Sequence, residues 1–184
     1  DRLREAVQRG FDWRRTAMHE RKWREELDSE TERLRRNLSE AFAALNIDSY
    51  DSLDAVLQML TLRERDLYDH AHRVETLAMR LADALGWTQI AREPLRRAAL
   101  LHDIGRLALP PALFRKTGPL SPDEQVLVRE GPHFAYELLR CCPFIADAAD
   151  IVRHRYERFD GRGFPGGLAG EAIPASSRIL AVVD

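Results

Sequence analysis

Residues 95–111 read LRRAALLHDIGRLALPP, and this stretch joins a helical pattern to two side chains that can bind a metal. The spacing of its apolar residues predicts a helix over Leu95–Ile104. His102 and Asp103 close that helix, and side chains at a helix end can reach one cation together because the backbone bends there. A His-Asp pair alone is weak evidence, since most such pairs are helix caps or surface salt links. The rest of the chain therefore has to decide between the two interpretations.

The sequence on either side of this helix predicts an all-α domain. Helical spacing of apolar residues recurs in residues 53–60, 74–85 and 146–156. Ser121 and Glu124 resemble a capping box at the start of another helix. No convincing alternation of apolar and polar residues indicates a strand. We therefore expect a helical bundle preceded by a long N-terminal helix.

Residues 1–46 are predicted to form that charged linker helix, and residues 47–184 the compact domain. Apolar residues close to a heptad stripe are Leu27, Leu34, Leu38, Phe42 and Leu45. Arginines interrupt the earlier part of the stripe at Arg14, Arg21 and Arg24. A coiled coil, which would make the protein a homodimer, and an amphipathic helix packed on its own domain therefore have equal support.

Composition excludes several classes of partner. The 184 residues include 28 Lys and Arg against 30 Asp and Glu, a net charge of -2, which gives no field that would gather DNA or an anionic membrane. No apolar run is long enough to span a bilayer, so a cytoplasmic location is expected. The adjacent Cys141 and Cys142 are unsuited to a structural disulfide with each other, and we expect both to be buried.

Two more residues could join the His-Asp pair from separate helices. His70 lies upstream and Asp184 closes the chain after an apolar stretch. Together with His102 and Asp103 they form a mixed nitrogen and oxygen set, which suits Mn, Fe, Zn or a similar divalent ion that activates water against phosphorus.

A long loop follows the last of the middle helices. Residues 158–174 hold five glycines and two prolines without periodicity. A loop of this length inside a compact domain is usually functional.

These motifs, in this order, resemble the HD-GYP family. The matching segments are residues 62–74, 98–110, 116–124, 156–173 and 178–184. DGRGFP at residues 160–165 stands for the family's Asp-Gly-x-Gly-Tyr-Pro, and Arg106 stands where lysine is usual. The resemblance implies a helical bundle of the HD-domain type. It also implies hydrolysis of the phosphodiester bonds of cyclic di-GMP at a site of two or three metals.

The resemblance assigns roles residue by residue. It implies that the metal ligands are His70, His102, Asp103 and Asp184, with Asp66, one helical turn before His70, as a further carboxylate ligand. It makes His102, Asp103 and Arg106 the catalytic set, with Arg106 on a phosphate. Further phosphate or partner contacts are expected at Arg155, Gly163, Phe164, Pro165 and Arg178.

The chain departs from the family at three imidazole positions. Gly131 stands where the family has a metal-ligating histidine, and Arg155 and Tyr156 stand in the family's His-His-Glu segment. Three missing ligands should disable the second and third metal positions, so one divalent ion, such as Fe or Mn, is the expected cofactor. An arginine there would repel a cation, but it could grip a phosphate in the metal's place.

Other residues of these types have plainer interpretations. His19, His72, His133 and His154 are taken as ordinary histidines. Three aromatic residues are expected to pack and hold the loop rather than stack on a base: Tyr156, Phe159 and Phe164.

Two functions remain open at this point. The lost ligands favour a degenerate module that binds cyclic di-GMP, another phosphoester or a signalling protein, the last through Gly163-Phe164-Pro165. The retained His70, His102, Asp103 and Asp184 favour a metal-dependent phosphodiesterase with a reduced site, so the sequence leaves open whether the protein is an enzyme. The N-terminal helix resembles the linker of a response regulator, and the domain is expected to lack its C-terminal helices. A purely structural role is the third alternative.

Overall fold

The computed structural model describes residues 25–26, 29–37, 39–41, 44, 47–60, 66–109, 113 and 116–184. These residues form an all-α fold, as the sequence predicts, without a strand in the described part of the chain. The main helices are α2 (Tyr50–Leu60), α3 (Leu67–Ala84), α4 (Gln89–Leu101), α6 (Pro122–Leu139), α7 (Ala149–Arg153) and α8 (Ala175–Val183). Short 3₁₀ turns are η1 (Ile104–Ala108), η2 (Ala146–Ala148) and η3 (Gly170–Ala172).

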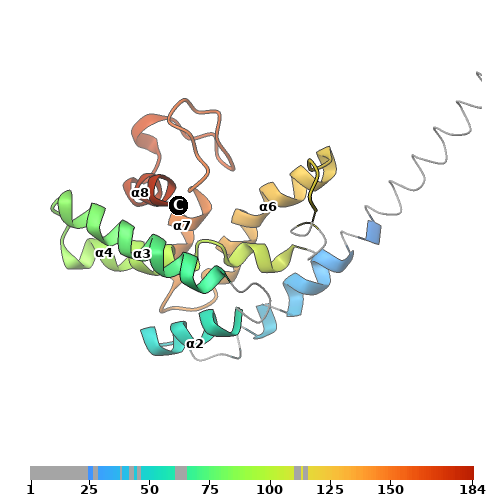
Figure 1. The fold of residues 1–184 in the computed structure, drawn as a ribbon, viewed down its shortest axis with the longest axis horizontal. Helices are drawn as coiled ribbons and strands as arrows, with labels where there is room; N and C mark the ends of the chain where they lie inside the picture. Colours follow the sequence, from blue (N-terminus) through green and yellow to red (C-terminus); the bar gives the residue numbers. More distant parts are fainter. Residues whose placement is uncertain are drawn as a thin grey trace, which may run out of the picture.

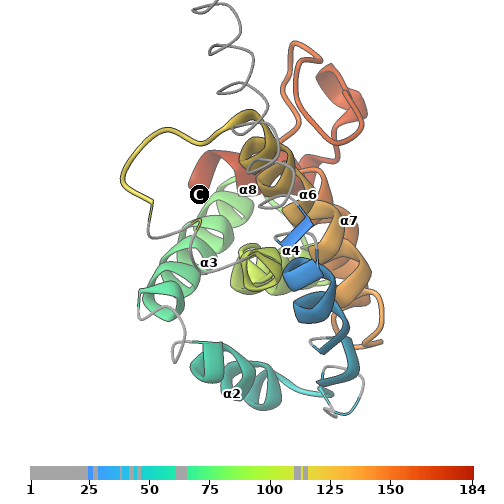
Figure 2. The same ribbon diagram turned by 90° about the vertical axis from the view of Figure 1, so that its right-hand side faces the viewer.

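The helices pack around one apolar core. α3 lies along α4, α6 contacts η1 and α7, and α8 contacts α3, α4 and α7. In Figures 1 and 2, α2 lies at the opposite edge of the bundle from α8 and the C-terminus. The largest fully buried apolar side chains are Leu53, Leu95, Leu101, Ile104, Leu138, Leu139, Ile145, Val152 and Leu180. This arrangement brings the C-terminal end of α8 against the middle of the bundle.

Several helix boundaries follow the predicted signals. The capping box at Ser121 and Glu124 is present, with both side-chain to backbone hydrogen bonds formed. Ser49 accepts a hydrogen bond from the backbone N–H of Ser52 at the start of α2. Gly86 has a φ of 71°, the left-handed conformation that ends α3.

Other boundaries differ from the prediction. α4 begins at Gln89 rather than Leu95, because Thr88 caps it by accepting from the N–H of Ala91. It ends at Leu101, so His102 and Asp103 lie in a turn before η1. The helix predicted for residues 146–156 is a 3₁₀ turn followed by the short α7. Apolar spacing marks the buried side of these segments but not the residue at which the backbone changes its hydrogen bonding.

Two predictions concern residues that are only partly described. Residues 29–37 and 39–41 are helical, but most of the predicted linker and heptad stripe lies outside the described residues. The expectation that both cysteines are buried is wrong for Cys141, which is exposed at the end of α6, while Cys142 is buried. Among the described residues, no helix is both long and apolar enough to cross a bilayer.

Candidate metal centre and the adjoining arginine pocket

Three side chains from different helices converge on one point. Nε2 of His70 on α3 lies 3.0 Å from Nε2 of His102, just after α4. Oδ1 of Asp184, at the end of α8, lies 3.1 Å from the first nitrogen and 3.2 Å from the second. All three ligand atoms lie within 4.8 Å of one another. Such spacings fit three ligands around one cation with bonds of about 2.0–2.2 Å.

His102 is oriented for that role. Its side chain is fully buried, and Nδ1 lies 2.7 Å from the carbonyl oxygen of Ala99, one turn back in α4. A carbonyl accepts only, so Nδ1 carries a proton and donates it. When a metal takes the place of the second ring proton, the lone pair of Nε2 faces His70 and Asp184. A backbone acceptor on the far ring nitrogen is the usual support of a metal-ligating histidine. The donor set therefore fits a divalent ion.

Asp103 lies beside this cluster and is held by two arginines. Its Oδ2 lies 3.6 Å from Nε2 of His102 and 4.0 Å from Nε2 of His70. The same oxygen accepts from Arg106 at 3.0 Å, and Oδ1 accepts from Arg155 at 2.8 Å. Burial alone would raise the pKa of Asp103, but the charges of Arg155, His102 and Arg106 outweigh burial and hold the pKa below its ordinary value. Asp103 is therefore a carboxylate that already has cationic partners.

Asp184 is ionised for related reasons. Its hydrogen bond with His102 lowers its pKa well below the ordinary value. Burial acts in the other direction, and the charges of His102, Arg155 and His70 add to the lowering. One oxygen of Asp184 faces the two imidazoles, while the other lies 3.6 Å from Nη1 of Arg155.

Arg155 follows α7 and connects the two carboxylates. The residue is only 7% exposed, and its guanidinium reaches Oδ1 of Asp103 and Oδ2 of Asp184. It also donates to the hydroxyl of Tyr156 and lies 4.4 Å from the centre of that ring. Within the described part of the chain, Nε and Nη1 of Arg155 have no hydrogen-bond acceptor. The guanidinium thus contacts Oδ1 of Asp103 and Oδ2 of Asp184. The other oxygen of each carboxylate, Oδ2 of Asp103 and Oδ1 of Asp184, faces the two histidines.

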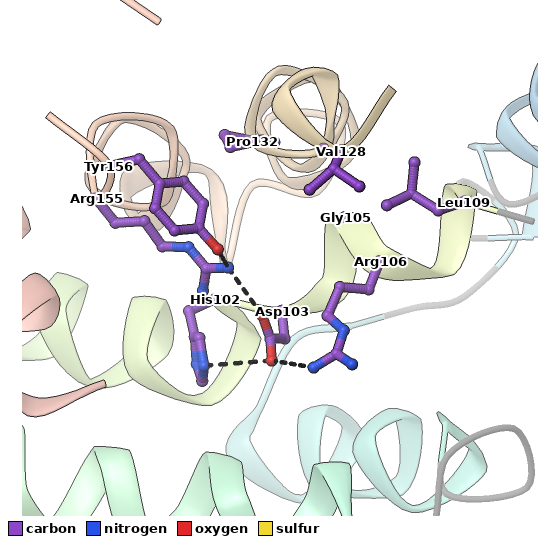
Figure 3. A pocket seen from close by; sticks show the side chains of 10 residues that line it. His102, Asp103, Gly105, Arg106, Leu109, Val128, Pro132, Arg155 and Tyr156 are labelled. Carbon is purple, nitrogen blue, oxygen red and sulfur yellow. Dashed lines mark hydrogen bonds and ion pairs between the residues drawn. The ribbon is translucent and has the colours of Figure 1, made fainter. Parts of the chain in front are cut away.

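A pocket of about 180 Å³ opens next to this arginine (Figure 3). It is lined by His102, Asp103, Gly105, Arg106, Leu109, Val128, Gly131, Pro132, Arg155 and Tyr156. Val128, Leu109 and Pro132 give it an apolar wall, and the two arginines give it a cationic one. A Cβ built on Gly131 would meet nothing within 4 Å. The pocket therefore includes open space at the position where the motif comparison expects a histidine.

The long loop is fastened by Glu157 and by stacked rings. The buried carboxylate of Glu157 accepts from the N–H of Gly166 at 2.6 Å and of Leu168 at 3.0 Å. Tyr156 stacks on Phe164 with ring centres 5.1 Å apart. These contacts confirm the predicted packing of Tyr156 and Phe164. Phe159 is 69% exposed, so its predicted packing role is wrong.

Comparison with known proteins decides the family. The model of the HD domain matches residues 54–184. The chain belongs to the HD domain family. This match and the relatives below confirm the recognition made from the ordered motifs.

The relatives of this HD domain carry related names. It is 35% identical, over 73% of the chain and 36% of the relative, to the cyclic di-GMP phosphodiesterase response regulator RpfG of Xanthomonas campestris pv. campestris. It is 32% identical, over 73% of the chain and 38% of the relative, to a cyclic di-GMP phosphodiesterase of Thermotoga maritima. A 3'3'-cGAMP-specific phosphodiesterase 2 of Vibrio cholerae is 31% identical over 66% of the chain and 24% of its own length. The HD domain chain spans well under half of each of these proteins.

Some residues predicted for the site lie apart from the metal cluster. Asp66 is exposed at the start of α3 and is not among the three converging ligands of the described residues. Arg178 lies in a different groove, beside Trp87 and Ile179 between α3 and α8. Gly163 and Pro165 lie in the loop and do not line the arginine pocket, and Phe164 reaches it only through the stack on Tyr156.

Three plain histidines are placed as expected, whereas His19 lies outside the described residues, and two other roles were missed. His133 is exposed, His72 lies 3.3 Å from Asp54, and Nδ1 of His154 bonds a backbone carbonyl of α7. Sequence reasoning did not foresee that Glu157 fastens the loop or that Tyr156 bonds Arg155. The available signal was Glu157 just before a glycine-rich loop, because a carboxylate there can accept from the loop's N–H groups.

Proposed function

We propose that this HD domain works in cyclic di-GMP signalling as a phosphoester-binding module with one metal position. The observation that carries the proposal is the place of Arg155. Its guanidinium bridges Asp103 and Asp184 beside the pocket, where the resemblance expects a ligand of a second metal. A fixed cation in that place can bind phosphate but cannot activate a nucleophile.

The residues that would hold the single metal are His70, His102 and Asp184, with Asp103 nearest as a fourth ligand. A bound divalent ion would polarise a phosphoryl oxygen and lower the pKa of water beside it. Arg155 and Arg106 would orient the phosphate from the pocket side, and the names of the relatives support a cyclic dinucleotide as its source. Binding of the phosphate group would then need only one metal ion. Hydrolysis that stabilises both the attacking and the leaving oxygen needs two.

A phosphodiesterase with a reduced site is the second candidate. It is favoured by the convergence of His70, His102 and Asp184 and by the backbone acceptor that orients His102. Here His102, Asp103 and Arg106 would form the catalytic set named by the resemblance. Slow turnover of cyclic di-GMP would follow from a single ion.

Binding and hydrolysis of cyclic di-GMP, measured on the same metal-loaded samples, separate these candidates. The module predicts binding by the wild type with little product. The triple variant Gly131→His, Arg155→His, Tyr156→His restores the three imidazoles and should turn over faster. Substantial wild-type turnover, equal to that of an active triple variant, would instead establish the enzyme, and absence of binding to loaded protein would rule out the module.

Wider roles belong to the same proposal. The domain would act in the cytoplasm as the output part of a response regulator, dimerise through the segment of residues 1–46 that the sequence predicts to be helical, and meet a signalling protein through Gly163-Phe164-Pro165. The similarity to a relative named as a response regulator supports the first role. The exposure of Pro165 supports a contact through the loop. Size determination of the chain with and without residues 1–46 tests the dimer.

A further inference from the structure

Two carboxylates and two guanidinium groups are paired beside the pocket when no metal is bound. Asp103 and Asp184 contribute two negative charges, and Arg155 and Arg106 contribute two positive charges. Both carboxylates are engaged by guanidinium groups at 2.8–3.6 Å. An anion entering the pocket would therefore have to compete with Asp103 for a buried cation.

A divalent ion changes this balance. An ion between His70, His102 and Asp184 adds two positive charges within a few ångströms of both carboxylates. The carboxylates would then be compensated from the metal side, because Oδ1 of Asp184 and Oδ2 of Asp103 already face the imidazoles. The attraction between Arg155 and those carboxylates would fall, and its charge would become available to an anion.

Arg155 has the geometry to use that charge. Its Nε and Nη1 have no acceptor among the described residues, although the residue is 7% exposed, and it lines the pocket. Nε lies on the same edge of the planar guanidinium as Nη2, which now bonds Asp103. Once a metal compensates Asp103, these two N–H groups together match two oxygens of a phosphoryl group. The pocket volume of about 180 Å³ admits one phosphoryl group and part of the molecule to which that group is bonded.

From this we infer that Arg155 couples metal loading to anion binding, so that the pocket becomes a phosphoryl site only after the metal has bound. The inference rests on the one-metal position of the proposed function and adds its regulation. Because coupling between two sites is reciprocal, phosphate must tighten the metal by the same factor by which the metal tightens phosphate.

Calorimetric titrations with Mn²⁺ and inorganic phosphate test this without any turnover. We expect wild-type protein to bind phosphate at least about tenfold more tightly with Mn²⁺ than with chelator, and Mn²⁺ more tightly by the same factor with phosphate. In Arg155→Gln the metal should still bind and the coupling should disappear. Arg155→Lys keeps the charge without the planar fork, so it should fold and retain a coupling weaker than that of the wild type.

Arg158→Gln is the matched control. It removes the same charge three residues along the chain, from an exposed pair with Asp160, and should keep the full coupling. Coupling that persists unchanged in Arg155→Gln and Arg155→Lys would show that phosphate contacts the metal alone, and it would overturn the inference while leaving the metal position intact. Equal phosphate affinity with and without Mn²⁺ would also overturn it. If wild type bound no metal at all, the proposed function would fail with it.

Discussion

Replacing Arg155 by alanine should strongly destabilise the metal-free protein. The guanidinium is buried and compensates Asp103 at 2.8 Å and Asp184 at 3.6 Å, so its removal leaves Asp103 as a buried charge with Arg106 as its remaining arginine partner. Breaking a buried pair by removing one member costs about 3–5 kcal/mol. For a chain of this size that corresponds to a fall in Tm of roughly 6–20 °C.

Thermal unfolding followed by circular dichroism in chelator measures this effect. The fall should shrink at acid pH, because protonated Asp103 needs no cation, and it should partly recover when Mn²⁺ compensates the carboxylates. Arg158→Ala, which removes an exposed arginine, should leave Tm unchanged. A Tm for Arg155→Ala equal to that of the wild type in chelator would refute the view that Arg155 is the cation that balances this site.

Three further outcomes follow from the structure. Glu157→Ala leaves two loop N–H groups without their acceptor and should cost roughly 2–4 kcal/mol, seen as a lower Tm and faster proteolysis within residues 158–174. Gly163→Ala should also destabilise the loop, because a Cβ there would overlap the backbone of Glu157, whereas Gly131→Ala, which faces open space, should not; comparison of the two melting curves checks this. The folded-state pKa of Asp184 is lowered, so its stabilising contribution is present above the unfolded pKa of about 3.9 and is lost as pH falls below that value. Asp184→Asn should therefore flatten the acid limb of Tm against pH, and an unchanged limb would contradict the assignment.

The ligand cluster was expected from the ordered motifs and their resemblance to the HD-GYP family, because helical spacing alone does not place three helices against one another. The structure brings His70, His102 and Asp184 together where α3, the end of α4 and α8 meet. Asp66 illustrates the limit of that reasoning. A spacing of four residues places two side chains on one helix face, but it does not turn both toward the same neighbour, and Asp66 is exposed.

Other features depend on packing that local patterns do not encode. Arg178 and Asp184 are six residues apart in and after α8, which puts them on different sides of the helix. The pairing of Arg155 with Asp103 joins residues 52 positions apart and depends on how α7 packs beside the end of α4. Sequence comparison identified an arginine in a ligand position, but only the packed structure shows which carboxylates it binds.

Metal content per chain, measured after anaerobic purification, tests the one-metal account most directly. The account predicts about one divalent ion per chain in the wild type and its loss in His102→Ala, since His102 is the buried ligand at the centre of the cluster. Two ions per chain in the wild type, or an ion that persists in His102→Ala, would contradict it.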